Sequence, residues 1–324
     1  MIAKLQADLD TIVASTLFDS ISVMSPSDRT RSRGRNPKYS QEQILRILVL
    51  KEILHLSFRD VVRKLYLNDS YRKLCLLKRD SIPSASTLSY RQSLEDFHVL
   101  IQKTVMLYEM SSRAPQFNAV DSTMVKPCLD HRARLQRKTG KYKDKNASWT
   151  KTTKDKWEYG YKAHISCDTE SSMVLEYSFA TAKEHDSTHF EDLVGSLRNS
   201  RYIFCDKAYD SKKVYDMILE RTSAIPVVDV NPRRGSSGPS NKDSLNRWIR
   251  KNLRVRYAHL YKRRWEIERV NANLKSIFFY SLEHIFYVPN RHYEKAVGLK
   301  LLTHNLVILA NILNGLPNNR KLVL

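Results

Sequence analysis

A short segment late in the sequence carries an ordered set of polar side chains. It spans Tyr261–Lys275 and reads YKRRWEIERVNANLK. Tyr261 is followed by Arg264, Glu268 and Lys275 at successive offsets of three, four and seven residues. At about 100° per residue, these offsets place all four side chains on one face of a helix. An ordinary salt-bridged helix face has the same composition, so the stripe alone does not define a site.

Two aspartates upstream each follow a short apolar run. Asp121 lies in FNAVDST, and Asp206 follows YIFC in the sequence YIFCDKAYDS. Short apolar runs of this kind are typical of strands buried on both faces of a sheet. We therefore expect each aspartate at the end of a buried strand. The alternatives are a strand-end turn residue for Asp121 and a helix cap for Asp206.

Together, these three segments resemble the prokaryotic insertion-sequence DDE transposases, a large superfamily whose signature is Y-x2-R-x3-E-x6-K. The resemblance covers roughly residues 40–310. It implies that Asp121, Asp206 and Glu268 form a catalytic triad that binds two Mg²⁺ ions, for which Mn²⁺ can substitute. It also implies that water cuts a transposon end and that the resulting 3′-hydroxyl then attacks target DNA. Tyr261, Arg264 and Lys275 are assigned by the resemblance to DNA at the transposon end.

Elementary chemistry explains why such a site is built from carboxylates. Phosphodiester cleavage requires a polarised nucleophile and a stabilised leaving oxygen, and two divalent cations about 4 Å apart supply both. These hard cations prefer oxygen ligands. The rival acids are Asp130, Asp168, Asp210 and Glu266. Asp206 is favoured over Asp210 because it directly follows the apolar run, and Glu266 is expected to point about 200° away from Glu268 around the helix.

The charge of the chain indicates a polyanionic partner. Lys and Arg number 55 against 34 Asp and Glu, which gives a net charge of +21. Nucleic acid is the simplest such partner, and we expect double-stranded DNA bound by a homodimer. A membrane surface is the competing partner, but no uninterrupted apolar stretch is long enough to span a bilayer. The first residues lack a signal-peptide pattern, which predicts a cytoplasmic, nucleoid-associated protein.

The predicted domains follow changes of periodicity. Residues 1–39 are expected to form a helix and a basic linker, residues 40–113 a helical DNA-binding domain, residues 114–316 the catalytic domain and residues 317–324 a tail. The second of these resembles a helix-turn-helix module. Its candidate DNA contacts are Ser86, Thr87 and Arg91, although Ser and Thr also simply cap helices.

The predicted catalytic domain is of mixed α/β class. Residues 161–167 alternate between apolar and polar, which predicts a half-buried strand with His164 facing solvent. Strand, hairpin, helix, strand, helix, strand and helix then follow, an order that by itself predicts only a mixed α and β domain. The resemblance implies that this domain has an RNase H-like fold, a mixed sheet flanked by helices. The basic segment 131–159 is interpreted as a loop that contacts DNA, with a merely flexible loop as the alternative.

Two further points complete the expectations. The cysteines Cys75, Cys128, Cys167 and Cys205 match no zinc-site spacing and are predicted to be core thiols. The functional alternatives to a transposase are a related nuclease without strand transfer and a non-catalytic DNA-binding protein with the same fold. Metal-dependent nicking of DNA distinguishes them.

Overall fold

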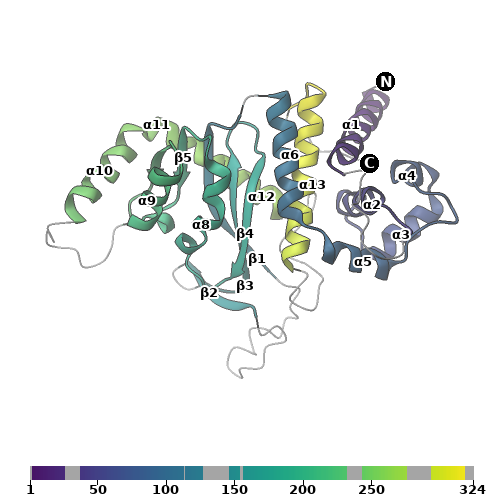
Figure 1. The fold of residues 1–324 in the computed structure, drawn as a ribbon, viewed down its shortest axis with the longest axis horizontal. Coiled ribbons are helices and arrows are strands. Elements are labelled where there is room, and N and C mark those ends of the chain that lie inside the picture. Colours follow the sequence, from purple (N-terminus) through teal and green to yellow (C-terminus); the bar gives the residue numbers. More distant parts are fainter. Residues whose placement is uncertain are drawn as a thin grey trace. The chain divides into compact units, whose positions relative to one another are not determined.

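The structure is a computed structural model that describes residues 2–25, 37–112, 114–126, 146–153, 156–231, 243–275 and 293–317. The chain divides into two compact units, one all-helical and one that contains the sheet (Figure 1). The helical unit consists of residues 1–111, 273–281 and 289–324, and the sheet unit of residues 112–272 and 282–288.

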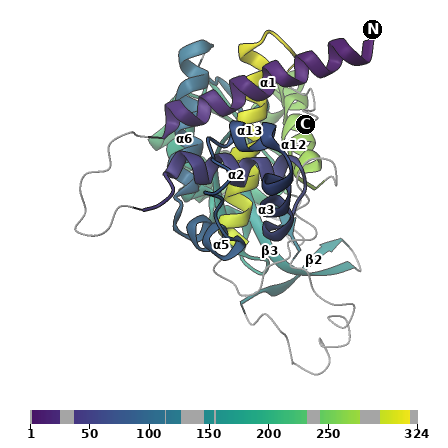
Figure 2. The same cartoon turned by 90° about the vertical axis from the view of Figure 1, so that its right-hand side faces the viewer.

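The helical unit is built around its last helix. Its helices are α1 (Ile2–Met24), α2 (Gln41–Ile53), α3 (Phe58–Leu67), α4 (Asp69–Leu74), α5 (Ala85–Leu94), α6 (Phe97–Ser111) and α13 (Tyr293–Leu313). Figure 2 shows α13 running among α1, α2 and α6, and it packs against all three. Helix α13 is long and apolar enough to cross a membrane, but 83% of its most apolar window is buried inside the protein.

The grouping of α13 differs from the predicted domain boundaries. The sequence predicts a catalytic domain that extends to residue 316, whereas α13 belongs to the helical unit. The reason is that its side chains are apolar nearly all round, and α1, α2 and α6 supply the surfaces that bury them.

Caps begin the helices of this unit where the sequence predicts them. Ser40 Oγ accepts from the Gln43 amide at 3.1 Å, and Gln43 Oε1 accepts from the Ser40 amide at 3.0 Å. This reciprocal capping box satisfies two amides that the helix leaves unbonded. Ser57 and Ser84 cap α3 and α5 by accepting from the amides of Asp60 and Thr87.

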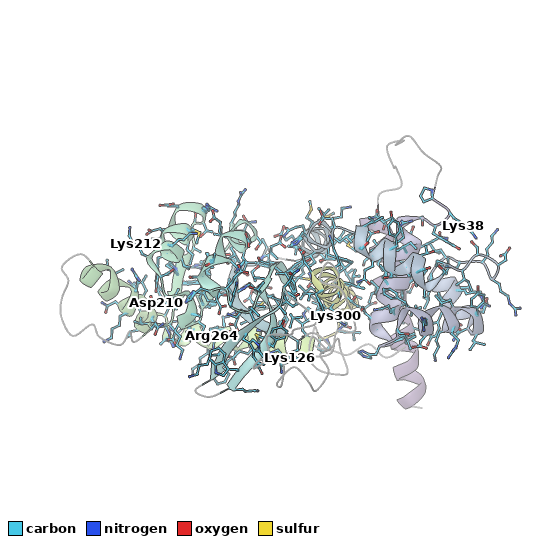
Figure 3. All side chains as sticks on the ribbon, turned by 90° about the horizontal axis from the view of Figure 1, so that it is seen from below. Lys38, Lys126, Asp210, Lys212, Arg264 and Lys300 are labelled. Carbon is cyan, nitrogen blue, oxygen red and sulfur yellow. The ribbon has the colours of Figure 1, made fainter. Side chains whose placement is uncertain are left out.

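A buried charge cluster joins α2 to α13. Glu52 lies 2.5 Å from Lys51 Nζ and 2.7 Å from Nζ of Lys300, which is labelled in Figure 3. Burial alone raises the pKa of Glu52, but Lys300 and Lys51 outweigh it and lower the pKa to about 2. The carboxylate is therefore held in its charged form inside the helical unit.

The sheet unit has six strands in mixed orientation. They are β1 (Phe117–Val125), β2 (Ser148–Thr153), β3 (Lys156–Asp168), β4 (Val174–Thr181), β5 (Tyr202–Cys205) and β6 (Ile225–Val228). Their order is β2-β3-β1-β5-β6, with β4 also paired to β3. Strands β1, β5 and β6 are parallel, and β3 is antiparallel to β1, β2 and β4.

Helices follow β4, β5 and β6 in the chain. They are η1 (Asp186–Thr188), α8 (Phe190–Val194), η2 (Gly195–Leu197), η3 (Lys207–Tyr209), α9 (Lys212–Arg221), α10 (Asp243–Arg256), α11 (Ala258–Tyr261), η4 (Lys262–Arg264) and α12 (Trp265–Lys275), where η marks a 3₁₀ helix. The order of strands and helices is the predicted one. The exception is β2 and the start of β3, which lie within the basic segment that was interpreted as a loop. That interpretation is wrong for residues 148–153 and 156–159, because those residues pair as an antiparallel ladder.

The pairing of β1 with β3 decides which side chains share a face of the sheet. Ser122 is opposite His164, and Met124 is opposite Lys162, so these four side chains lie on one face. Asp121 is opposite Ile165 and lies on the other face. Helix α8 packs on β3 and β4.

The prediction that His164 faces solvent is wrong. Its ring is fully buried and stacks on His189, with ring centroids 4.5 Å apart. Burial lowers the pKa of His164 to about 4, which keeps the ring neutral. The alternating pattern assigned this face to water, but His189 covers the ring, and Ser122 and Lys162 on the same face donate to Asp186.

The cysteine prediction is confirmed where the structure describes the residue. Cys75, Cys167 and Cys205 are free, buried thiols. Burial raises the pKa of Cys75 to about 12, so this thiol is not a reactive thiolate. Cys128 lies outside the described residues.

Candidate active site

Strand register places Asp121 and Asp206 side by side. The parallel pairing of β1 and β5 ends with Val120 opposite Cys205, so each aspartate is the next residue on its own strand. Neighbouring strands lie about 4.8 Å apart. The prediction that Asp121 ends its strand is wrong, because β1 continues to Val125. Asp121 lies instead within β1, at the level where the neighbouring strand β5 ends.

The environment of Asp121 favours a shared proton or cation. Burial, with smaller contributions from the charges of Asp206 and Asp186, raises the pKa of Asp121 to about 7. The Ser122 amide and the Arg264 guanidinium act in the opposite direction. Two neighbouring carboxylates resist simultaneous ionisation, and a bound cation relieves that repulsion.

Asp206, and not Asp210, is the partner of Asp121. Asp206 caps η3, and its Oδ1 accepts from the Lys207 amide at 2.5 Å. Asp210 instead accepts from the Asn231 amide at 2.9 Å and lies 3.4 Å from Arg250. Asp210 thus serves to tie the loop after β6 and helix α10 to the turn after β5.

Arg264 joins the third acid to the two aspartates. Its Nη2 lies 2.5 Å from Oε1 of Glu268. Burial lowers the pKa of Arg264, but Tyr261, Glu268, Asp121 and Asp206 together outweigh it and raise the pKa. The guanidinium, labelled in Figure 3, therefore lies within the field of all three predicted catalytic acids.

The signature segment is not one continuous helix. Tyr261 ends α11, the 3₁₀ helix η4 covers Lys262–Arg264, and α12 begins at Trp265. The tighter 3₁₀ turn changes the angle between Tyr261 and the residues of α12 from that expected for an α-helix. Lys275 is the last residue of α12, in the part of the chain grouped with the helical unit.

Tyr261 has a different position from the one expected of a DNA contact. It is buried, and its hydroxyl donates to the carbonyl oxygen of Cys205 at 3.2 Å. The Arg254 guanidinium lies 3.6 Å from the ring centroid. Because a phenol has a single proton to donate, Tyr261 holds the signature segment against the end of β5 and does not offer that proton to a phosphate.

Glu266 makes contacts of its own, away from the three acids. It accepts a short hydrogen bond from Ser172 in the β3–β4 turn and lies 3.1 Å from Arg269. Asp168, the last residue of β3, accepts from the Ser171 hydroxyl in this turn at 2.6 Å. Both rivals are thereby explained as turn-stabilising residues, and Asp130 lies outside the described residues.

The sequence did not identify two residues that make polar contacts around this part of β1. Asn271 Nδ2 donates to Oδ2 of Asp121 at 3.2 Å. On the opposite face of the sheet, Asp186 accepts from Ser122 at 3.0 Å and from Lys162 at 2.6 Å. The position of Asn271, three residues after Glu268 and thus on the same helix face, was the available signal. Nothing in the sequence signalled the pairing of Asp186 with Ser122.

The candidate DNA contacts of the helical unit lie on and beside α5. Ser86 Oγ and Thr87 Oγ1 each lie 2.9 Å from Ser84 Oγ, the capping atom of this helix. Arg91 donates to the carbonyl oxygen of Tyr39 at 3.2 Å. The cap of α5 is thus Ser84, and the hydroxyls of Ser86 and Thr87 contact this capping side chain.

The donor set suits a divalent cation. Within the described ranges, no three His, Cys, Asp or Glu side chains are grouped as ligands of a single ion in this conformation. The three carboxylates nevertheless interact electrostatically with one positive charge, the guanidinium of Arg264. Carboxylate oxygens are the ligands that Mg²⁺ and Mn²⁺ prefer, so the residues fit the ion that the resemblance implies.

Comparison with known proteins identifies the family. The profile of the Transposase DDE domain matches residues 112–306, and that of the Transposase domain (DUF772) matches residues 6–93. The chain belongs to the transposase DDE domain family. The predicted fold class is confirmed, since the mixed sheet flanked by helices is the RNase H-like fold of such transposases, preceded by a helical region.

Solved transposase structures are similar to this chain at low identity. One is the piggyBac transposase in a cryo-EM synaptic complex with hairpin DNA, at 12% identity and a TM-score of 0.45, covering 97% of this chain and 75% of that chain. Another is the Mos1 transposase in a paired-end complex with the left transposon end, at 11% identity and a TM-score of 0.21, covering 76% and 82%.

Proposed function

We propose that the protein is the DNA transposase of a prokaryotic insertion sequence. It binds the terminal inverted repeats of its element, cuts the DNA there and transfers the strand to a target. The observation that carries this proposal is the register of β1 and β5, which makes Asp121 and Asp206 neighbours beside an arginine that also binds Glu268.

The three carboxylates are proposed to hold Mg²⁺, with Mn²⁺ as a substitute. When bound, two such ions polarise the attacking water or 3′-hydroxyl and stabilise charge on the leaving oxygen. Asp121 contributes a ligand from within β1 and Asp206 from the residue that directly follows β5, so the pairing of these strands fixes their separation. Glu268 contributes from α12 and exchanges its contact with Arg264 for the cation.

The basic side chains are proposed to hold the DNA. Arg264 and Lys275 contact phosphates at the transposon end, and Ser86, Thr87 and Arg91 contact DNA from the helical unit. The net charge of +21 supports a duplex partner, for both the transposon end and the target. A homodimer on DNA in the cytoplasm, at the nucleoid, is the proposed working state.

Metal-dependent nicking tests the proposal. Purified protein is incubated with Mg²⁺ and a duplex that carries the terminal repeat of the element, and 5′- and 3′-labelled strands report cutting. A supercoiled plasmid in the same reaction reports joining of the new 3′-end. Cutting together with joining is expected. Cutting without joining would identify a nuclease, and binding without cutting would identify a non-catalytic DNA-binding protein.

A further inference from the structure

We infer that Asn271 is a fourth residue of the metal site, an inference that rests on the proposed function. Its amide nitrogen positions Asp121, and its amide oxygen is a neutral ligand to the divalent cation. The two roles belong to the two polar atoms of one side-chain amide, Nδ2 and Oδ1.

The first observation is the contact with Asp121. Asn271 Nδ2 donates to Oδ2 of Asp121 at 3.2 Å. An ionised carboxylate only accepts hydrogen bonds, so the nitrogen end of the amide faces it. A neutral donor fixes the carboxylate without competing with a cation for its charge, as a lysine or arginine at this position would.

The second observation is the oxygen end of the same amide. Asn271 is 7% exposed, and its Oδ1 is buried and accepts no hydrogen bond from the described residues. A buried carbonyl oxygen without a partner destabilises the folded state, and such an atom in a native site requires an explanation. Because the oxygen and the nitrogen belong to one planar amide, the contact of the nitrogen with Asp121 keeps this oxygen near the same carboxylate.

The third observation is the position on α12. Asn271 follows Glu268 by three residues, which places the two side chains about 60° apart on one helix face. One helix therefore supplies a carboxylate and an amide oxygen toward the same strands. Divalent hard cations accept Asn carbonyl oxygens as well as carboxylates.

The test measures Mn²⁺ binding to the full-length protein without DNA, by the loss of the free-ion signal in electron paramagnetic resonance. Asn271→Leu keeps the volume and removes both polar ends. It is expected to weaken Mn²⁺ binding by about tenfold, the lower end of the effect of removing a group that orients a ligand. Asn271→Asp restores an oxygen ligand and is expected to bind Mn²⁺ within about threefold of the wild type.

Asn273→Leu is the matched control, since it changes the same residue type about 200° around the same helix. It is expected to bind Mn²⁺ like the wild type, and thermal midpoints of all variants show that each is folded. Mn²⁺ binding by Asn271→Leu at the wild-type level would overturn the inference, and equal weakening in Asn271→Leu and Asn271→Asp would overturn the ligand role. If the wild type itself neither binds Mn²⁺ nor nicks DNA, the proposed function fails instead.

Discussion

At the scale of single residues, Glu268 and Glu266 differ in role although they are two positions apart. Glu268→Gln keeps the shape of the side chain and removes the charge that binds metal, so we predict a protein that still binds DNA and cuts none at any Mg²⁺ concentration. Glu266→Gln weakens the contacts with Ser172 and Arg269, and should cost about 1 kcal/mol of unfolding free energy while cleavage continues. Loss of cleavage in Glu266→Gln, with cleavage retained in Glu268→Gln, would contradict the site.

Tyr261 provides a second prediction at this scale. Tyr261→Phe removes the hydroxyl that donates to Cys205 and should lower the free energy of unfolding by about 1–3 kcal/mol, because the carbonyl loses its partner. It should also slow cleavage, since Cys205 directly precedes Asp206. The salt dependence of DNA binding should stay unchanged. A slope smaller by one phosphate contact would instead return Tyr261 to the DNA interface.

The sequence correctly predicted those residues whose local pattern identifies the strand or helix that contains or precedes them. The apolar runs before Asp121 and Asp206 located β1 and β5, and the offsets after Tyr261 located the acid on α12. It failed for Asn271, Asp186 and the burial of His164, because those features depend on pairing between distant segments. An alternating strand does not reveal whether a helix covers its polar face.

At the scale of elements, Asp186 joins β1 and β3 to the loop after β4. Lys162→Met leaves the Asp186 carboxylate, only 15% exposed, without its cation and should cost on the order of 1–3 kcal/mol. Adding Asp186→Asn should cost less than the sum of the two single changes, because the second removes the charge that the first left unpaired. Denaturant unfolding of the four proteins measures this. Strict additivity would show that the pair does not couple these strands.

The cluster that joins α2 to α13 predicts a pH dependence of the helical unit. The folded pKa of Glu52 is about 2, below its ordinary value of 4.5, so the folded state binds this proton less readily than the unfolded state. Its contribution to stability is therefore present above pH 4.5 and is lost as the pH falls toward about 2. Helical circular dichroism should show this loss, and Glu52→Gln should flatten it. An unchanged acid profile in Glu52→Gln would contradict the assignment.

At the scale of the whole molecule, the net charge of +21 predicts DNA binding that weakens steeply with salt. The logarithm of affinity should fall linearly with the logarithm of salt concentration, by about 0.9 for each phosphate contacted. Arg264→Ala and Lys275→Ala should each reduce the slope by roughly one contact. Fluorescence anisotropy of labelled duplexes measures this, and a slope near zero would exclude a phosphate-dominated interface.

We propose that Asp121, Asp206 and Glu268 act together as one metal-dependent catalytic site. Single-turnover cleavage of a terminal-repeat duplex by the wild type, Asp121→Asn, Asp206→Asn, Glu268→Gln and the triple variant tests it most directly. Residues that act as a unit are strongly non-additive, so each single variant should lose about as much cleavage as the triple variant, with DNA affinity retained. Near-wild-type cleavage by any one of the single variants would contradict the account.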